Sequence, residues 1–232
     1  SITEISDIAA GSLAKFQNSL DLSGLTKLSD AVAQNLSTHK ADLILDGLTE
    51  LSDAAAEILS KCKGNLYLNG ITELSEAVAE SLSAHTGVLS LGGVNTLSAS
   101  VAEVLSKHGG SLDLCGLKKL SEGVAESLSK CKGDFLSLGN SLEKLDDSPS
   151  VIALFHRLMN QKPNEHGEIN IYLSGLKVIP HSVLEILSKS KSHHHIYLSI
   201  TELSDLDAKT LSDSEGSLVL ISVEKISEIA AD

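Results

Sequence analysis

Residues 20–37, LDLSGLTKLSDAVAQNLS, decide the fold, because this pattern returns four more times with little change. The later copies open at Leu43, Leu66, Leu89 and Leu112, about 23 residues apart. Three columns keep one phase through all copies: Gly24, Gly47, Gly70, Gly93 and Gly116; Leu28, Leu51, Leu74, Leu97 and Leu120; Ala33, Ala56, Ala79, Ala102 and Ala125. A fixed period in this range predicts a solenoid of stacked copies rather than a single globular core.

Each copy divides into a short strand and a short helix. The first part alternates, as in Leu66-Tyr67-Leu68-Asn69, which places its leucines on one face of a strand. A serine then precedes a helical stretch at the position expected of an N-cap. These serines are Ser29, Ser52, Ser75, Ser98 and Ser121. We expect glycines to end the helices as C-caps, at Gly64, Gly87, Gly110 and Gly133.

The pattern Leu-x-Leu-x-Gly-Leu-x-x-Leu-Ser resembles the bacterial leucine-rich repeats, strongly over residues 20–134 and more weakly beyond. The resemblance implies an α/β horseshoe, with a parallel β-sheet on the concave side and short helices on the convex side. Gly stands where those repeats usually carry Asn or Cys after the strand. The lateral hydrogen-bond ladder that such an Asn makes is therefore not assured here.

We interpret the whole chain as one solenoid domain. Residues 1–19 form a partial repeat, 20–135 five regular repeats, 136–170 an irregular repeat with an insertion at about 146–168, 171–217 two degenerate repeats, and 218–232 a last partial repeat. Both ends fall inside a repeat, so we expect a segment of a larger bacterial protein. Apolar layers at the two ends also predict a possible end-to-end dimer.

Composition excludes some partners. The net charge is −13 and the single arginine is Arg157, which argues against binding to nucleic acid or to anionic membranes. No run of 18 apolar residues is present, so we expect no membrane insertion. Cys62, Cys115 and Cys131 are predicted to be free thiols, because Cys62 and Cys131 hold one repeat position three copies apart. Free thiols favour the cytoplasm without excluding a secreted protein, so the location stays unknown.

Residues with catalytic or metal-binding chemistry do not form a convincing site. The same position in five successive repeats is occupied by histidine or cysteine: His39, Cys62, His85, His108 and Cys131. A metal ridge is conceivable from these residue types, but packing at the helix ends is the favoured interpretation. The triplet at 193–195 is interpreted as a solvated loop that enters a strand. Lysines flank Cys62 and Cys131 and would lower the pKa of a thiol, but no base is specified nearby. We predict no catalytic, cofactor or metal residue.

The outward side chains of the strands are the predicted partner-binding surface. All three tyrosines of the chain fall in the central outward column, and no Lys or Arg falls in it or in the two flanking columns. Tyrosine favours interfaces because it offers a large rigid area with a polar tip. Consecutive repeats carry Tyr172 and Tyr197, whose rings are expected to stack. The predicted residues are Asp21, Asp46, Asn65, Tyr67, Asn69, Asp113, Phe135, Tyr172 and Tyr197.

A non-enzymatic scaffold that binds a protein partner on its concave face is the function that the sequence favours. The alternative is a structural spacer in a large multidomain protein, with no ligand of its own; the small polar concave side chains fit this equally well. A third interpretation, an enzyme built on the insertion, would use His156, Arg157, Glu165 and His166, but four polar residues do not define a site.

Overall fold

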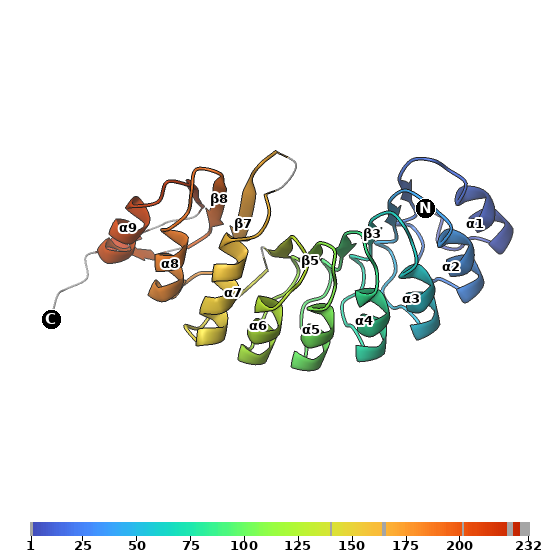
Figure 1. Ribbon diagram of the computed structural model, residues 1–232, viewed down its shortest axis with the longest axis horizontal. Coiled ribbons are helices and arrows are strands. Elements are labelled where there is room, and N and C mark those ends of the chain that lie inside the picture. The colour runs from blue at the N-terminus through green and yellow to red at the C-terminus, as the bar shows by residue number, and fades with distance from the viewer. Residues whose placement is uncertain (1, 140, 164–165, 201, 222–224, 228–232) are drawn as a thin grey trace.

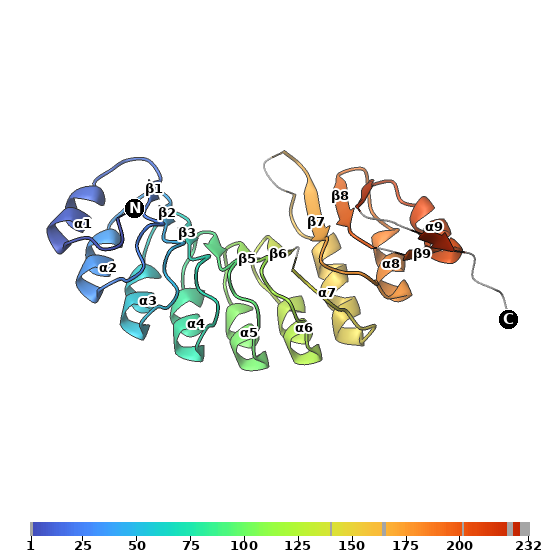
Figure 2. The ribbon, with the colours of Figure 1, turned by 180° about the vertical axis from the view of Figure 1, so that it is seen from behind.

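The computed structural model describes residues 2–139, 141–163, 166–200, 202–221 and 225–227 as one curved array of strand–helix coils. Figures 1 and 2 show the helices in a single row along the outer side and the strands along the inner side. The helices are α1 (Asp7–Leu13), α2 (Asp30–Leu36), α3 (Asp53–Leu59), α4 (Glu76–Ser83), α5 (Ala99–Leu105), α6 (Glu122–Ser129), α7 (Pro149–Met159), α8 (His181–Leu187) and α9 (Asp205–Ser212). None of the helices in the described ranges is long and apolar enough to cross a membrane.

Serine caps begin all the described helices except α8, whose N-cap is Pro180 with no side-chain hydrogen bond. Ser29 Oγ accepts a hydrogen bond from Val32 N at 3.2 Å, which satisfies a backbone donor that the first turn leaves without a partner. The five predicted capping serines all act in this way, and three more serines do the same. The full set is Ser6, Ser29, Ser52, Ser75, Ser98, Ser121, Ser148 and Ser204.

The strands form a parallel sheet of six and two smaller sheets. The first sheet joins β1 (Leu20–Asp21), β2 (Leu43–Ile44), β3 (Leu66–Tyr67), β4 (Leu89–Ser90), β5 (Leu112–Leu114) and β6 (Leu136–Leu138) in chain order. The second has the order β10-β8-β7, from β10 (Ser217–Leu220), β8 (His194–Leu198) and β7 (Ile169–Leu173). The third pairs β11 (Lys225–Ser227) with β9 (Glu202–Ser204). The sheet is interrupted between β6 and β7, whereas the row of helices continues through α6 and α7 (Figure 1).

The core is a thin continuous layer between strands and helices. Leu43, Leu45 and Leu48 face Ala56 and Leu59, and all five side chains are fully buried. The small alanine lets the helix lie close to the strand, so each coil closes over a few aliphatic side chains. Successive helices and strands contact one another and the buried side chains form one continuous cluster, which makes stability a property of the stack.

The predicted glycine C-caps are wrong. The helices end in ordinary right-handed or nearly helical residues, for example Ser60 and Ser106, and the only glycine with a positive φ in the described part of the chain is Gly167. Crowding between coils explains the glycines instead. A Cβ at Gly110 would lie 2.0 Å from Gly87 O, and one at Gly64 would lie 2.1 Å from Ala41 O. Only glycine lets successive backbones approach this closely.

Candidate binding surface

Two ladders of side chains join neighbouring coils on either side of the strands. On one side, Asp42 Oδ1 accepts Asn65 N at 3.0 Å and Asn65 Oδ1 accepts Val88 N at 3.0 Å. On the other side, Asp46 Oδ1 accepts a hydrogen bond from Asn69 N at 2.9 Å, and Asn69 Oδ1 accepts one from Gly92 N of the next coil at 2.7 Å. A lateral ladder therefore exists although Gly occupies its usual position. Three residues predicted to bind a partner, Asp46, Asn65 and Asn69, use one oxygen each to hold the coils together.

A groove of about 530 Å³ lies on the strand side, between Tyr67 of β3 and Phe135 just before β6. It exists because the intervening coils present small side chains, including Val88, Ser90 and Ser111, between two aromatic walls. We call this hollow the Tyr67–Phe135 groove. It brings together three of the predicted binding residues, because Asp113 also lines it.

Part of the groove lies outside the repeats and was not predicted from the sequence. Lys162 and Pro163, from the segment after α7, also line it. Lys162 Nζ forms an ion pair with Asp134 Oδ1 at 2.8 Å, and its backbone N donates to Asp134 O at 3.2 Å. No repeat phase covers this segment, so the pattern carried no signal of where it lies.

The acidic residue at the centre of the groove is held by neutral donors. Asp113 Oδ1 accepts Cys115 N at 3.0 Å, and Asp113 Oδ2 lies 3.1 Å from Ser90 Oγ. Ser90 is buried and its hydroxyl also lies 2.8 Å from Asn69 Oδ1. Asp113 is therefore fixed in direction while its charge stays available to a ligand.

The electrostatic environment of Tyr67 reflects this acidic surface. Burial raises the pKa of the Tyr67 phenol, and the negative charges of Asp42, Asp46 and Asp113 raise it further. The phenol is therefore neutral at physiological pH and can serve as an uncharged wall of the groove.

The other predicted binding residues lie apart from the groove. Tyr172 and Tyr197 stack as predicted, with ring centroids 4.6 Å apart and planes inclined by 15°, but they belong to the β10-β8-β7 sheet. Asp21, on β1, accepts two hydrogen bonds from Ser23 of its own turn, which lower the pKa of its carboxyl. The predicted surface is thus divided between a groove on the first sheet and a tyrosine pair on the second.

The column of histidines and cysteines packs between coils. His39 Nδ1 lies 3.3 Å from Ala14 O and His85 Nδ1 lies 3.3 Å from Ser60 O, so each ring meets a carbonyl of the preceding coil. Burial raises the pKa of the Cys62 thiol to about 11, opposite to the lowering that its flanking lysines suggested. The described residues contain no group of three or more His, Cys, Asp or Glu side chains placed to hold a metal ion. Phe16, one repeat before His39 in the same phase, is 53% exposed.

His194 corrects the interpretation of the histidine triplet as a solvated loop. It is the first residue of β8 and is buried. His194 Nδ1 accepts a hydrogen bond from Lys191 N at 2.6 Å. The ring proton is therefore on Nε2, which donates to Met159 O at a distance of 3.0 Å. His195 lies outward beside Glu168, with its Nε2 3.7 Å from Glu168 Oε1.

The polar residues of the insertion have structural contacts. Arg157 Nη2 donates to Gly133 O at 2.7 Å, and Nε lies 3.4 Å from Cys131 O. Gln161 Oε1 accepts Leu136 N at 3.0 Å, at the edge of β6 where the sheet stops. His156 is exposed on α7, and Glu165 lies outside the described residues.

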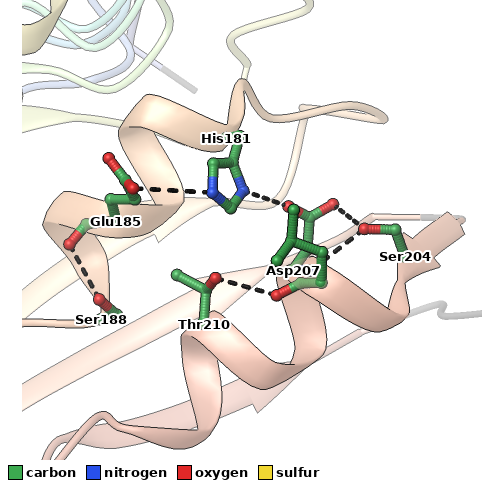
Figure 3. Close-up of polar contacts among 7 residues, drawn as sticks. His181, Glu185, Ser188, Ser204, Asp207 and Thr210 are labelled. Atoms are coloured by element: carbon green, nitrogen blue, oxygen red, sulfur yellow. Dashed lines mark hydrogen bonds and ion pairs between the residues drawn. The ribbon is translucent and has the colours of Figure 1, made fainter. Parts of the chain in front are cut away.

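A serine, an aspartate and a histidine also meet at the junction of α8 and α9 (Figure 3). His181 Nδ1 lies 2.7 Å from Asp207 Oδ1, and Ser204 Oγ donates to Asp207 Oδ2 at 2.6 Å. Figure 3 shows Ser204 on the side of Asp207 away from His181, so the histidine is not placed to take the serine's proton. Ser204 also accepts Asp207 N at 3.1 Å as the cap of α9. The cluster therefore joins two coils and lacks the geometry of a nucleophile with its base.

No protein-family model and no curated protein sequence matches the chain. A solved leucine-rich-repeat protein of Leptospira interrogans is similar over 97% of this chain and 70% of its own, with 15% sequence identity and a TM-score of 0.46. The leucine-rich-repeat fold itself follows from the units of this chain, each with a parallel strand and a short helix.

Proposed function

We propose that the protein is a non-enzymatic scaffold that binds a protein partner on its concave face, centred on the Tyr67–Phe135 groove. The observation that carries this proposal is the groove itself: two aromatic walls, a floor of small side chains and a fixed carboxylate on the strand side of the array. Interfaces concentrate their binding energy in aromatic anchors within partly desolvated hollows. A stacked solenoid holds such a hollow on a stiff frame, which lowers the entropy cost of binding.

The ladders beside the strands support the same function. They satisfy backbone donors of the next coil with side chains from Asp42, Asp46, Asn65 and Asn69. A partner therefore meets a surface whose polar groups are already oriented. Tyr172 and Tyr197 would extend the contact area for a long partner.

Affinity capture with matched variants tests the proposal. The immobilised protein is compared with a Tyr67→Ser, Phe135→Ser double variant and with a Glu80→Gln control on the convex helix α4, where Glu80 is exposed. Circular dichroism and thermal unfolding first establish that all three are folded. We expect a protein that the wild type and the control retain and that the double variant loses. Equal retention by all three would contradict a concave site at this groove, and no specific retention would favour the structural spacer.

A Tyr172→Ser, Tyr197→Ser variant separates the two aromatic surfaces. If the partner spans both sheets, this variant weakens capture without abolishing it. If capture is unchanged, the tyrosine pair has no part in binding and the contact is confined to the groove.

A further inference from the structure

We propose that the Tyr67–Phe135 groove holds an extended segment of the partner that carries lysine or arginine, with the cationic head placed at Asp113 between the two aromatic walls. This inference rests on the proposed concave-face function and names the chemistry of its partner.

The shape of the groove fits a narrow segment. Its lining comes from four successive coils, from Tyr67 on β3 to Phe135 and Ser137 at β6, so the hollow runs across the strands. Adjacent strands lie roughly 4.8 Å apart, so the two walls stand about three strand spacings from each other. The floor includes Ser90, which is buried, and Asp113 lies one strand further. A long side chain can therefore enter between the aromatic rings and reach the carboxylate.

The charge of this surface selects a cation. The outward residues of β1 to β6 and the residues that flank them include Asp21, Asp42, Asp46 and Asp113 and no lysine or arginine. Within the described ranges, the ion pairs involve none of these four carboxylates. The one lysine that lines the groove, Lys162, is paired with Asp134. An anionic segment would meet uncompensated repulsion, whereas a cationic one gains attraction in a partly desolvated hollow.

The aromatic walls favour lysine or arginine over a bare metal ion. The aliphatic stem of either side chain can pack against Phe135, the wall one strand spacing from Asp113, and the cationic head is attracted to an aromatic ring as well as to the carboxylate. A hydrogen bond to a charged acceptor is stronger than one between neutral groups, and the Asp113 carboxylate, whose Oδ2 lies 3.1 Å from the Ser90 hydroxyl, offers such an acceptor. A metal ion has no aliphatic stem to pack against the aromatic walls.

Fluorescence anisotropy with labelled octapeptides tests the inference directly. The probes alternate serine with lysine, glutamine or glutamate, so an extended peptide presents one kind of side chain on one face. We expect the lysine peptide to bind more tightly than the glutamine peptide, the glutamate peptide to show no binding, and rising salt to weaken the lysine peptide. Asp113→Asn should raise the Kd of the lysine peptide about tenfold and Phe135→Ser about fivefold.

The variants keep the frame intact. Asn at position 113 retains an oxygen for Cys115 N and can turn its amide toward Ser90, so the local hydrogen bonds survive. Glu80→Gln removes one negative charge from the convex side and is the matched control for net charge. Its Kd for the lysine peptide should equal that of the wild type.

The results separate this inference from the proposed function. Equal binding of the lysine and glutamine peptides, no binding at millimolar peptide, or an unchanged Kd in Asp113→Asn would overturn the cationic assignment. If the peptide test fails in one of these ways but the Tyr67→Ser, Phe135→Ser variant no longer retains the cellular partner, binding on the concave face stands and only the preference for a cation is wrong. If the cellular partner is instead retained by that double variant, the groove is not the binding site and both proposals fail.

Discussion

At the scale of single residues, His85 and His194 make the stack sensitive to acid. Burial lowers the pKa of both imidazoles, and the Ser60 and Met159 carbonyls offset this only in part. The folded protein therefore binds fewer protons than the unfolded chain, whose histidines titrate near pH 6.5. We expect the contribution of these histidines to the free energy of unfolding to be complete above pH 6.5 and to decrease as the pH falls below it. The urea midpoint measured between pH 8 and pH 5 tests this.

His194→Gln isolates one contribution to this pH dependence. Glutamine can still donate to Met159 O but cannot become charged, so we expect a loss of about 1 kcal/mol at pH 8 and a shallower decline below pH 6.5. His156→Gln, at an exposed position on α7, is the control and should leave the profile unchanged. A His194→Gln profile parallel to that of the wild type would show that His194 is protonated equally well in the folded and unfolded states.

Cys62, which is buried, and Cys131, which is half-buried, should be slow to react in the native protein. Burial raises the pKa of the Cys62 and Cys131 thiols to about 11, although Arg157 lowers that of Cys131 in part. The thiolate is the reactive form, so at pH 8 we expect labelling by a disulfide reagent at least about a hundredfold slower than for a free cysteine. Variants with a single cysteine are compared folded and in urea. Fast native labelling of Cys62 would mean that this coil opens readily or that the thiol is not buried.

At the scale of elements, the end of the first sheet depends on two side chains, Arg157 of α7 and Gln161, two residues after that helix. Gln161 Oε1 occupies the place where a further strand would accept Leu136 N, and Arg157 lies 3.5 Å from the same oxygen. Gln161→Leu should cost about 1–3 kcal/mol, because a buried backbone donor loses its acceptor. The amide of Leu136 should also exchange faster with deuterium.

Asn160→Ala is the neighbouring control for Gln161→Leu. Its side chain is exposed and donates to His156 O within α7, so we expect a change below about 0.5 kcal/mol and normal exchange at Leu136. Equal costs for the two variants would show that the loss of Gln161 acts through the helix rather than through the sheet edge.

The elements themselves were predictable where the repeat is regular. Ser29 and its equivalents begin helices, and Leu20 and its equivalents lie in parallel strands, because periodic leucines and a capping serine are local signals. The interruption after β6 was not predictable as a sheet boundary, since it depends on Gln161 reaching a strand 25 residues earlier.

The candidate site was predictable only in part. Outward positions followed from the alternation of the strands, so Tyr67, Asp113 and Phe135 were found. The alternation does not tell which outward side chains form hydrogen bonds to the next coil. It therefore predicts Asn65 and Asn69 as binding residues, whereas in the structure one oxygen of each accepts a backbone N–H of the next coil. Lys162 lies outside the repeat, and only the path of the chain after α7 brings it to the groove.

At the scale of the whole molecule, the spacing of the coils is limited by glycine. A Cβ at Gly110 would meet Gly87 O, and a Cβ at Gly133 would lie 1.8 Å from Gly110 O, so one substitution forces two coils apart. Because stability in a solenoid comes from interfaces between neighbours, such a separation should weaken the whole array rather than one turn.

Gly109 and Gly110 provide a test of this limit within one turn of the chain. A Cβ at Gly109 would meet nothing within 4 Å, so Gly109→Ala should leave stability unchanged or raise it by about 0.5 kcal/mol, through a less flexible unfolded chain. Gly110→Ala should cost about 3 kcal/mol or more, because the close contact is with backbone, which has no alternative rotamer. Urea unfolding of the two variants gives the comparison. Similar midpoints would mean that the coils separate at little cost, and a frame that separates so easily would not hold the aromatic walls of the groove at a fixed distance.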